Sequence, residues 1–184
     1  MFRQTFGVSP FLLALVLVAP EVAIAADSTP PTTPVVADDG ASTSSTSSLH
    51  ASWTSRDPES GIVDNQYQIR QDSPSGPTVV NWTSTKTVTA VTRTSLKLQQ
   101  GKMYFFGVKT KNGAGKWSAI GSSDGITVDT TGPSAVTVSD DGATTTSTTQ
   151  LHATWTSASD AESGIVGYEY LIRQDSTIGP IIIN

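Results

Sequence analysis

Two histidines, His50 and His152, are the only side chains in this sequence suited to acid–base chemistry near neutral pH, and the chain has no cysteine. Each histidine is on the polar side of an alternating pattern, as in Leu49-His50-Ala51-Ser52-Trp53. A hydrolytic triad requires a nucleophile, a base and an orienting group within hydrogen-bond reach, and a metal site requires clustered ligands. A single histidine on a solvated strand face meets neither condition. We therefore predict no catalytic, cofactor-binding or metal-binding residue, and a protein that is not an enzyme.

The acidic residues offer a second kind of chemistry, because several fall in turns. Asp38 and Asp39 belong to a first inter-strand turn, Asp129 to a later joint, and Asp160 and Glu162 to a turn beyond that joint. Calcium takes six to eight oxygen ligands, several of them carboxylates, so these turns could bind it if they converge. The alternative is that aspartate and glycine are present for local hydrogen bonding in turns. We expect no cofactor, with calcium at the joint kept as a hypothesis.

Three aromatic residues are candidates for a surface role. Phe105 alternates out of phase with Tyr104 and Phe106, and Trp82 and Trp117 lie in neighbouring strand patterns. A row of exposed rings could stack on a sugar or dock a protein partner. Alternatively, the rings pack across strands and stiffen the sheet. The face occupied by Trp82 stays open at this point.

These candidate residues lie in a duplicated sequence. Residues 38–81 return as residues 140–184, and 28 of 44 aligned positions are identical. The offset is 102 residues as far as Trp53/Trp155 and 103 from Asp57/Asp160 onward. A period of this length indicates two copies of a domain. We call residues 33–129 copy one and residues 130–184 copy two, and we interpret copy two as a partial domain.

The first 25 residues have the pattern of a signal peptide. Arg3 is followed by an apolar stretch from Phe11 to Val18 and by the small-residue site Ala23-Ile24-Ala25. A membrane anchor would need about 20 apolar residues, and Pro20 interrupts the stretch earlier. We therefore expect residues 1–25 to be cleaved, residues 26–32 to form a linker, and the protein to be secreted or at the cell surface, with no membrane span.

The rest of the chain is patterned for short β-strands. No stretch after the leader has helical periodicity, and turn residues recur every 8 to 12 positions, as in a two-sheet sandwich. Predicted strands of copy one cover residues 34–36, 49–54, 66–70, 78–83, 96–98, 104–110, 116–119 and 126–128.

Copy one contains the motif Leu98-x-x-Gly101-x-x-Tyr104-x-Phe106-x-Val108 after the inward Trp53. With these residues copy one resembles a fibronectin type III domain. The resemblance covers residues 33–129 in full and 130–184 in part. It implies that the Tyr104 hydroxyl bonds to backbone near Leu98 and that Trp53 fills the core. The fold class expected is all-β, with tandem immunoglobulin-like sandwiches of which the second is incomplete.

The function expected from these features is structural. The net charge is −5 and the eleven basic residues are scattered, so we expect no nucleic-acid partner. The repeats resemble arrayed domains of exported bacterial proteins, which implies a spacer and adhesion or recognition scaffold with a protein or carbohydrate ligand. The alternative is an accessory region of a longer secreted enzyme, a glycan hydrolase or protease. We also predict that residues 33–129 fold alone and residues 130–184 do not.

Overall fold

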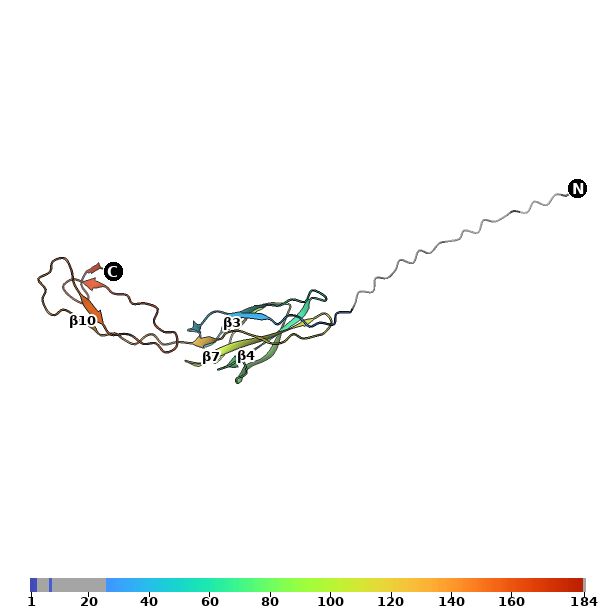
Figure 1. The fold of residues 1–184 in the computed structure, drawn as a ribbon, viewed down its shortest axis with the longest axis horizontal. Helices are drawn as coiled ribbons and strands as arrows, with labels where there is room; N and C mark the ends of the chain where they lie inside the picture. Colours follow the sequence, from blue (N-terminus) through green and yellow to red (C-terminus); the bar gives the residue numbers. More distant parts are fainter. Residues whose placement is uncertain (3–6, 8–25, 184) are drawn as a thin grey trace.

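The computed structural model describes residues 1–2, 7 and 26–183, so almost all of the segment interpreted as a signal peptide lies outside the described residues. All regular elements in the described part are β-strands. These residues contain no helix with the length and apolar character needed to cross a membrane. Figure 1 shows copy one as a layered sandwich and copy two as long loops with short strands.

Copy one is built from two sheets. The first has the order β1-β3-β6, with β1 Val35–Asp38, β3 Leu49–Thr54 and β6 Ala90–Arg93. The second has the order β2-β9-β7-β4-β5, and β8 also pairs with β7. Its strands are β2 Ser42–Thr43, β4 Ile62–Gln71, β5 Thr78–Lys86, β7 Met103–Asn112, β8 Gly121–Ser122 and β9 Ile126–Val128.

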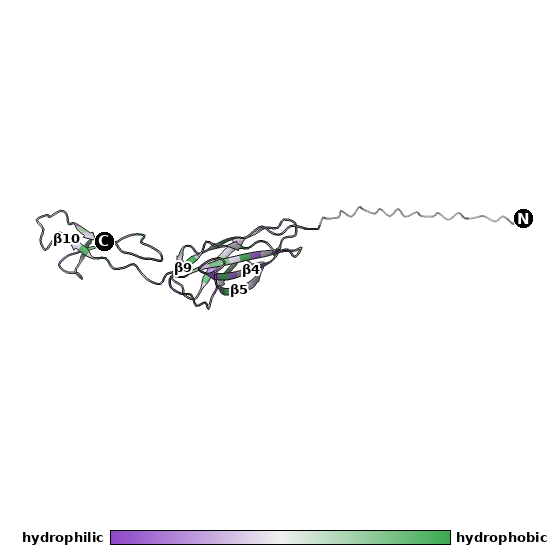
Figure 2. Cartoon of the chain, turned by 60° about the horizontal axis from the view of Figure 1, so that its bottom comes forward, coloured by the Kyte–Doolittle hydropathy of each residue, from purple (hydrophilic) through white to green (hydrophobic). Residues whose placement is uncertain are grey.

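The two sheets bury a common apolar core between them. Leu49, Ala51 and Trp53 of β3 point inward, and they pack in one cluster with side chains of β4, β5, β7 and β9. Hydrophilic and hydrophobic residues both occur along β4 and β5 (Figure 2), as expected for strands with one face toward a core. The structure thus confirms the predicted all-β, immunoglobulin-like and fibronectin type III-like sandwich.

Three details of the strand prediction are wrong. Residues 96–98 form no strand, although Leu96 and Leu98 donate backbone hydrogen bonds to Ser47 and Thr46. Leu98 is nevertheless buried in the core. β3 pairs with β1 on one side, and on its other side it pairs with β6, at residues 90–93, which the alternation pattern did not reveal. The strand predicted at 116–119 is also absent, because only Trp117 pairs there, in an isolated bridge to Lys111.

The expected tyrosine corner is present. The Tyr104 hydroxyl accepts a hydrogen bond of 3.0 Å from the backbone amide of Gln99, which directly follows Leu98. Gly101 allows the chain to turn here, because its φ of 71° lies in the left-handed region. Its amide donates to Val128, the last residue of β9. The corner therefore connects the β7 strand to the end of copy one.

Replacing Tyr104 with phenylalanine should lower the stability of copy one by about 1 kcal/mol, because the ring stays packed but its hydrogen bond is lost. A loss of that size corresponds to a fall of about 4–8 °C in melting temperature for a domain of this size. Thermal unfolding followed by circular dichroism measures it. Unchanged melting would show that the corner contributes no net stability.

Copy two has only fragments of this architecture. β10 Val138–Asp140 pairs with β11 Ala153–Trp155, and β12 Ile172–Arg173 pairs with β13 Ile181–Ile183. Trp155 is 41% exposed, whereas Trp53 is 3% exposed. The described residues of copy two therefore leave apolar side chains uncovered that copy one buries.

Candidate functional site

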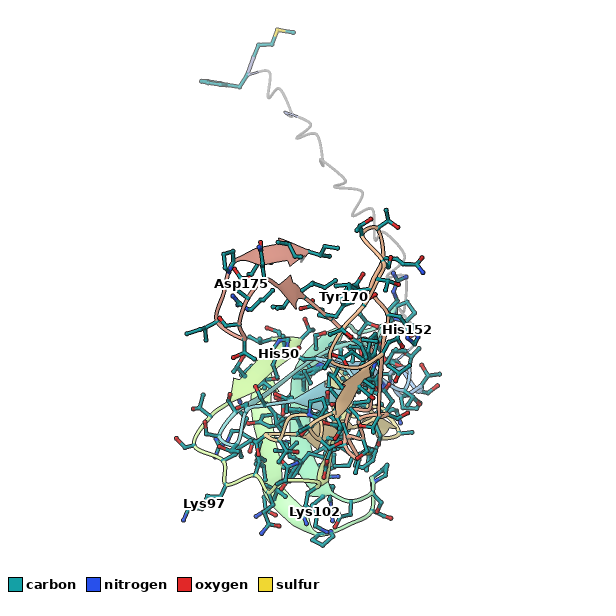
Figure 3. All side chains as sticks on the ribbon, turned by 90° about the vertical axis from the view of Figure 1, so that its left-hand side faces the viewer. His50, Lys97, Lys102, His152, Tyr170 and Asp175 are labelled. Carbon is teal, nitrogen blue, oxygen red and sulfur yellow. The ribbon has the colours of Figure 1, made fainter. Side chains whose placement is uncertain are left out.

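The two histidines each contact an aspartate in the first turn of their own copy. His50 Nδ1 lies 2.7 Å from Asp39 Oδ1, and His152 Nδ1 lies 2.8 Å from Asp141 Oδ1. All four side chains are exposed. The two histidines lie apart from each other (Figure 3), so they form no shared site.

A hollow beside His50 is lined by hydroxyl side chains, including Ser45 and Ser48. These two hydroxyls lie 3.0 Å from each other, and among the described residues neither is hydrogen-bonded to the imidazole. In copy two the position of Ser48 is taken by Gln150, although the His–Asp pair is repeated. The repeated pair therefore acts as a tie between strand and turn, and it does not activate a serine.

The carboxylates at the joint do converge. Asp129, Asp160 and Glu162 each offer an oxygen, and these oxygens lie within 4.8 Å of one another. Asp38 and Asp39 are not part of this group, since Asp39 contacts His50 and Asp38 accepts a bond from Gly40. The sequence-based grouping was thus correct for three of the five residues.

The structure also reveals an equivalent group that the sequence analysis missed. Asp27, Asp57 and Glu59 converge in the same way at the start of copy one. They are the counterparts of the joint residues at offsets of 102, 103 and 103 positions, so the repeat itself contained the signal. We call these two groups, each with the serine that follows its glutamate (Ser60 or Ser163), the carboxylate clasps.

In copy one the clasp is held by a buried amide. Asn112, the last residue of β7, is fully buried, and its Nδ2 lies 2.7 Å from Asp27 Oδ2 and 2.9 Å from Asp57 Oδ2. The same nitrogen lies 2.8 Å from the carbonyl of Thr29. The Asn112 amide group thus lies against both carboxylates, in the position where a cation could otherwise bind. Its hydrogen bonds hold the linker against the end of the sandwich.

The turn between β3 and β4 supplies the rest of the clasp. Asp57 accepts a 2.8 Å hydrogen bond from the backbone amide of Ser60, and the Ser60 hydroxyl donates to Asp27. In copy two, Asp160 accepts a 2.8 Å bond from the amide of Ser163. The Asp-x-Glu-Ser-Gly sequence therefore forms the same side-chain-capped turn in both copies.

At the joint, Asp129 contacts both copies. Its Oδ1 accepts hydrogen bonds from Gln100 of copy one at 3.3 Å and from the Thr131 amide at 3.1 Å. The Ser163 hydroxyl of copy two holds the pKa of Asp129 below its ordinary value, with the Thr131 amide as the next cause. Gln100 also accepts a 2.6 Å bond from the Thr130 amide. The connecting segment is thus hydrogen-bonded on both sides.

The clasps are adequately explained by these hydrogen bonds. Calcium needs six to eight oxygen ligands, and each clasp gathers three acidic residues. We expect the melting temperature of the chain to be the same in millimolar calcium as in excess chelator. Thermal unfolding in the two buffers measures this, and a clear rise with calcium would contradict the hydrogen-bond interpretation and support a metal site.

The pKa of Asp57 lies below the ordinary carboxyl value of 3.8, chiefly because the Ser60 amide donates to the carboxylate. A carboxyl group whose pKa is lower in the folded state contributes its full stabilisation at a pH above its pKa in the unfolded state. This contribution is lost as the pH falls through its pKa in the folded state. As the pH drops below about 4, the melting temperature of copy one should therefore decrease. The melting temperature of the Asp57→Asn variant should decrease less steeply over the same pH range. Parallel thermal unfolding series in acid measure both slopes. Identical slopes would show that Asp57 does not contribute to acid sensitivity.

The aromatic residues pack across the strands of the second sheet. Lys109 Nζ lies 4.5 Å from the centroid of the Trp82 ring and 4.7 Å from that of Trp117. Lys111 Nζ lies 5.7 Å from the Trp117 ring, and Phe105 is buried. A lysine between two indole rings is a stabilising cation–π arrangement. These contacts favour the cross-strand alternative over a row of free rings.

No known family model matches this chain, and no curated protein matches it. Among solved structures it is similar to titin module A71 from human cardiac muscle, with 22% identity, a TM-score of 0.38, and coverage of 53% of this chain and 88% of that one. It is also similar to titin domains A168–A170, with 21% identity, a TM-score of 0.37, and coverage of 54% and 32%. It is also similar to the twitchin kinase region from C. elegans, with 18% identity, a TM-score of 0.36, and coverage of 55% of this chain and 16% of that one. The chain thus spans less than two thirds of the length of titin domains A168–A170 and of the twitchin kinase region. At these values none of them assigns a function to it.

Proposed function

We propose that this protein is an exported, non-catalytic scaffold whose fibronectin type III-like domains act as spacers and carry surfaces for adhesion or recognition. The observation that supports this most directly is the joint. Asp129 is hydrogen-bonded to Gln100 of copy one and to the Thr131 amide, and its carboxylate lies beside those of Asp160 and Glu162 of copy two, so the connection has a preferred geometry. A connection of this kind transmits orientation from one domain to the next.

The repeat of the clasp extends the argument to both copies. In copy one, Asp27 is held by Ser60 and Asn112, and at the joint Asp129 lies in the equivalent position beside Asp160 and Glu162. Each copy therefore binds the segment that precedes it. In an array, such a device would orient every domain relative to its predecessor, and relative motion between domains is the default in its absence.

The chemistry of the described side chains gives no support to an enzyme. Each histidine pairs with an exposed aspartate, and of the two serines beside His50 only Ser45 has a serine at the equivalent position of copy two, since Gln150 replaces Ser48. The leader pattern supports export, and the exposed loops at the sandwich ends are suitable for contact with a protein or carbohydrate ligand. Such a ligand would bind to surfaces that the joint holds at a defined spacing.

The test measures whether the joint is ordered. The chain has no native cysteine, so spin labels at Lys97→Cys and Ala161→Cys report the distance between the copy-one corner and the copy-two turn. Both positions are exposed, and Figure 3 shows Lys97 projecting outward. We expect a single narrow distance distribution that broadens with Asp129→Ala.

The matched control is Asp124→Ala, because Asp124 is an exposed aspartate of copy one outside the clasps. It should leave the distribution unchanged. A broad distribution in the unsubstituted chain, or equal broadening by both replacements, would overturn the proposal that the domains are oriented spacers.

A further inference from the structure

Two lysines on the outer face of the second sheet lie against tryptophan rings in a single row. Lys109 Nζ lies between the Trp82 and Trp117 rings, and Lys111 Nζ lies beside Trp117 on the same face. We call Trp82, Lys109, Trp117 and Lys111 the Lys–Trp row. Its members come from β5, from β7 and from the loop after β7, so the folded sheet brings them together. All four side chains are half-buried, and each is partly open to solvent.

The row crosses the sheet over β4, which lies between β7 and β5. Gln66 of β4 is opposite Lys109 on one side and opposite Ser84 on the other. Directly opposite residues of neighbouring strands point to the same face of a sheet, so Gln66 and Ser84 border the row. Amide and hydroxyl groups of this kind form hydrogen bonds with the hydroxyl groups of a sugar.

The lysines of the row carry charge that no carboxylate of the protein neutralises directly. In the described part of the chain neither Lys109 nor Lys111 forms a salt bridge. Asp64 is opposite Lys111 in the backbone register, but its carboxylate accepts hydrogen bonds from the Ser84 hydroxyl and the Gln66 amide. The row is thus cationic on a chain whose net charge is −5. Its charge is complementary to that of an anionic partner.

The rings hold the lysines in place before any ligand arrives. A lysine side chain has many rotamers, and ordering it when a ligand binds costs conformational entropy. Lys109 is already held between two indole rings, so less of this cost remains. The rims of the rings also offer apolar surface to the C–H groups of a sugar. A sugar that carries an anionic group is complementary to both the lysines and the rings.

We propose that the Lys–Trp row binds an acidic polysaccharide, with carboxylates of the glycan on the Lys109 and Lys111 ammonium groups and its sugar rings against the indole rims. The inference rests on the proposed function, because it names the class of ligand that the scaffold recognises. A nucleic acid is a poorer fit, because its affinity depends on neutralising a run of phosphates and the row offers two lysines.

Isothermal titration of the full chain with oligomers of galacturonic acid tests the proposal. We expect saturable binding that weakens as salt is added, because salt screens the charges. The fully methyl-esterified oligomer has the same sugar rings without the charge, and oligoglutamate has the charge without the rings. Both should bind at least about ten-fold more weakly. Absence of saturable binding of the acidic oligomer would overturn the proposal, and equally tight binding of oligoglutamate would overturn the assignment to a glycan.

Substitutions locate the binding on the row. Lys109→Gln should weaken binding at least about ten-fold, because it removes the charge held between the rings. The matched control is Lys97→Gln, which removes the same charge from an exposed lysine outside the row and should leave binding unchanged. Trp117→Leu should also weaken binding, although it keeps both charges. Circular dichroism checks that each variant is folded, and equal binding by the Lys109 and Lys97 variants would overturn the assignment to the row.

The outcome is separable from that of the joint experiment. The spin labels report the distance between the copies and contain no glycan, whereas the titration reports binding to copy one. An ordered joint without glycan binding would overturn this inference alone. Glycan binding with a broad distance distribution would overturn the oriented spacer and leave the ligand class in place.

Discussion

Replacing Trp53 with alanine should destabilise copy one by about 3–5 kcal/mol, and the same replacement at Trp155 should change stability by less than about 0.5 kcal/mol. The two tryptophans occupy equivalent positions in the repeat, but Trp53 is 3% exposed and Trp155 is 41% exposed. A domain of this size is stable by only about 5–15 kcal/mol. The Trp53→Ala variant should therefore be close to unfolding at room temperature.

Chemical denaturation followed by circular dichroism measures both variants against the unsubstituted chain. The Trp53 Nε1 has no hydrogen-bond partner among the described residues, so its loss removes packing and leaves no acceptor unpaired. The two variants control for each other, because they delete the same atoms in local sequences that differ only by Ser52 and Thr154 between Leu49/Leu151 and Trp53/Trp155. Comparable losses at the two positions would mean that copy two packs Trp155 as copy one packs Trp53.

Replacing Asn112 with alanine should have the second largest effect, a loss of about 3 kcal/mol. Its amide contacts Asp27, Asp57 and the Thr29 carbonyl, and its Oδ1 accepts a 2.8 Å bond from the Lys116 amide. Buried partners left unsatisfied cost about 1–3 kcal/mol each, and charged partners cost more. Denaturant unfolding measures the loss of stability.

A second readout tests the role of Asn112 in holding the linker. Limited proteolysis should cut near residues 27–30 faster in Asn112→Ala than in the unsubstituted chain, because the linker is no longer fastened. The matched control is Asn81→Ala, an exposed asparagine in β5. If Asn112→Ala were no less stable and no more readily cut than Asn81→Ala, the clasp would have no role in holding the linker.

Much of the fold could be predicted from local patterns. The alternation of Leu49, Ala51 and Trp53 indicated an inward strand face, and all three are in the core. The Leu98-to-Tyr104 spacing indicated the corner that the Tyr104 hydroxyl forms. These predictions succeed because a strand with one buried face imposes a period of two on its own sequence.

Local patterns failed where a residue is buried without being in a strand. Leu98 is apolar and buried, but its backbone amide donates to Thr46 in a loop of the other half of the domain. The pattern at 96–98 was therefore interpreted as a strand, and β6 was missed. Edge strands such as β6 carry a weak signal, because two of its four residues are exposed.

By itself the sequence determined the duplication, the all-β class and the inward face of β3, since these depend on neighbouring positions and on the comparison of two copies. Only the tertiary structure decided which turns meet. Asn112 bonds to Asp27 across 85 positions and to Asp57 across 55, and these contacts exist because β4 and β7 pair in one register. The same holds for the exposure of equivalent residues, since Trp53 is buried in copy one and Trp155 is 41% exposed in copy two.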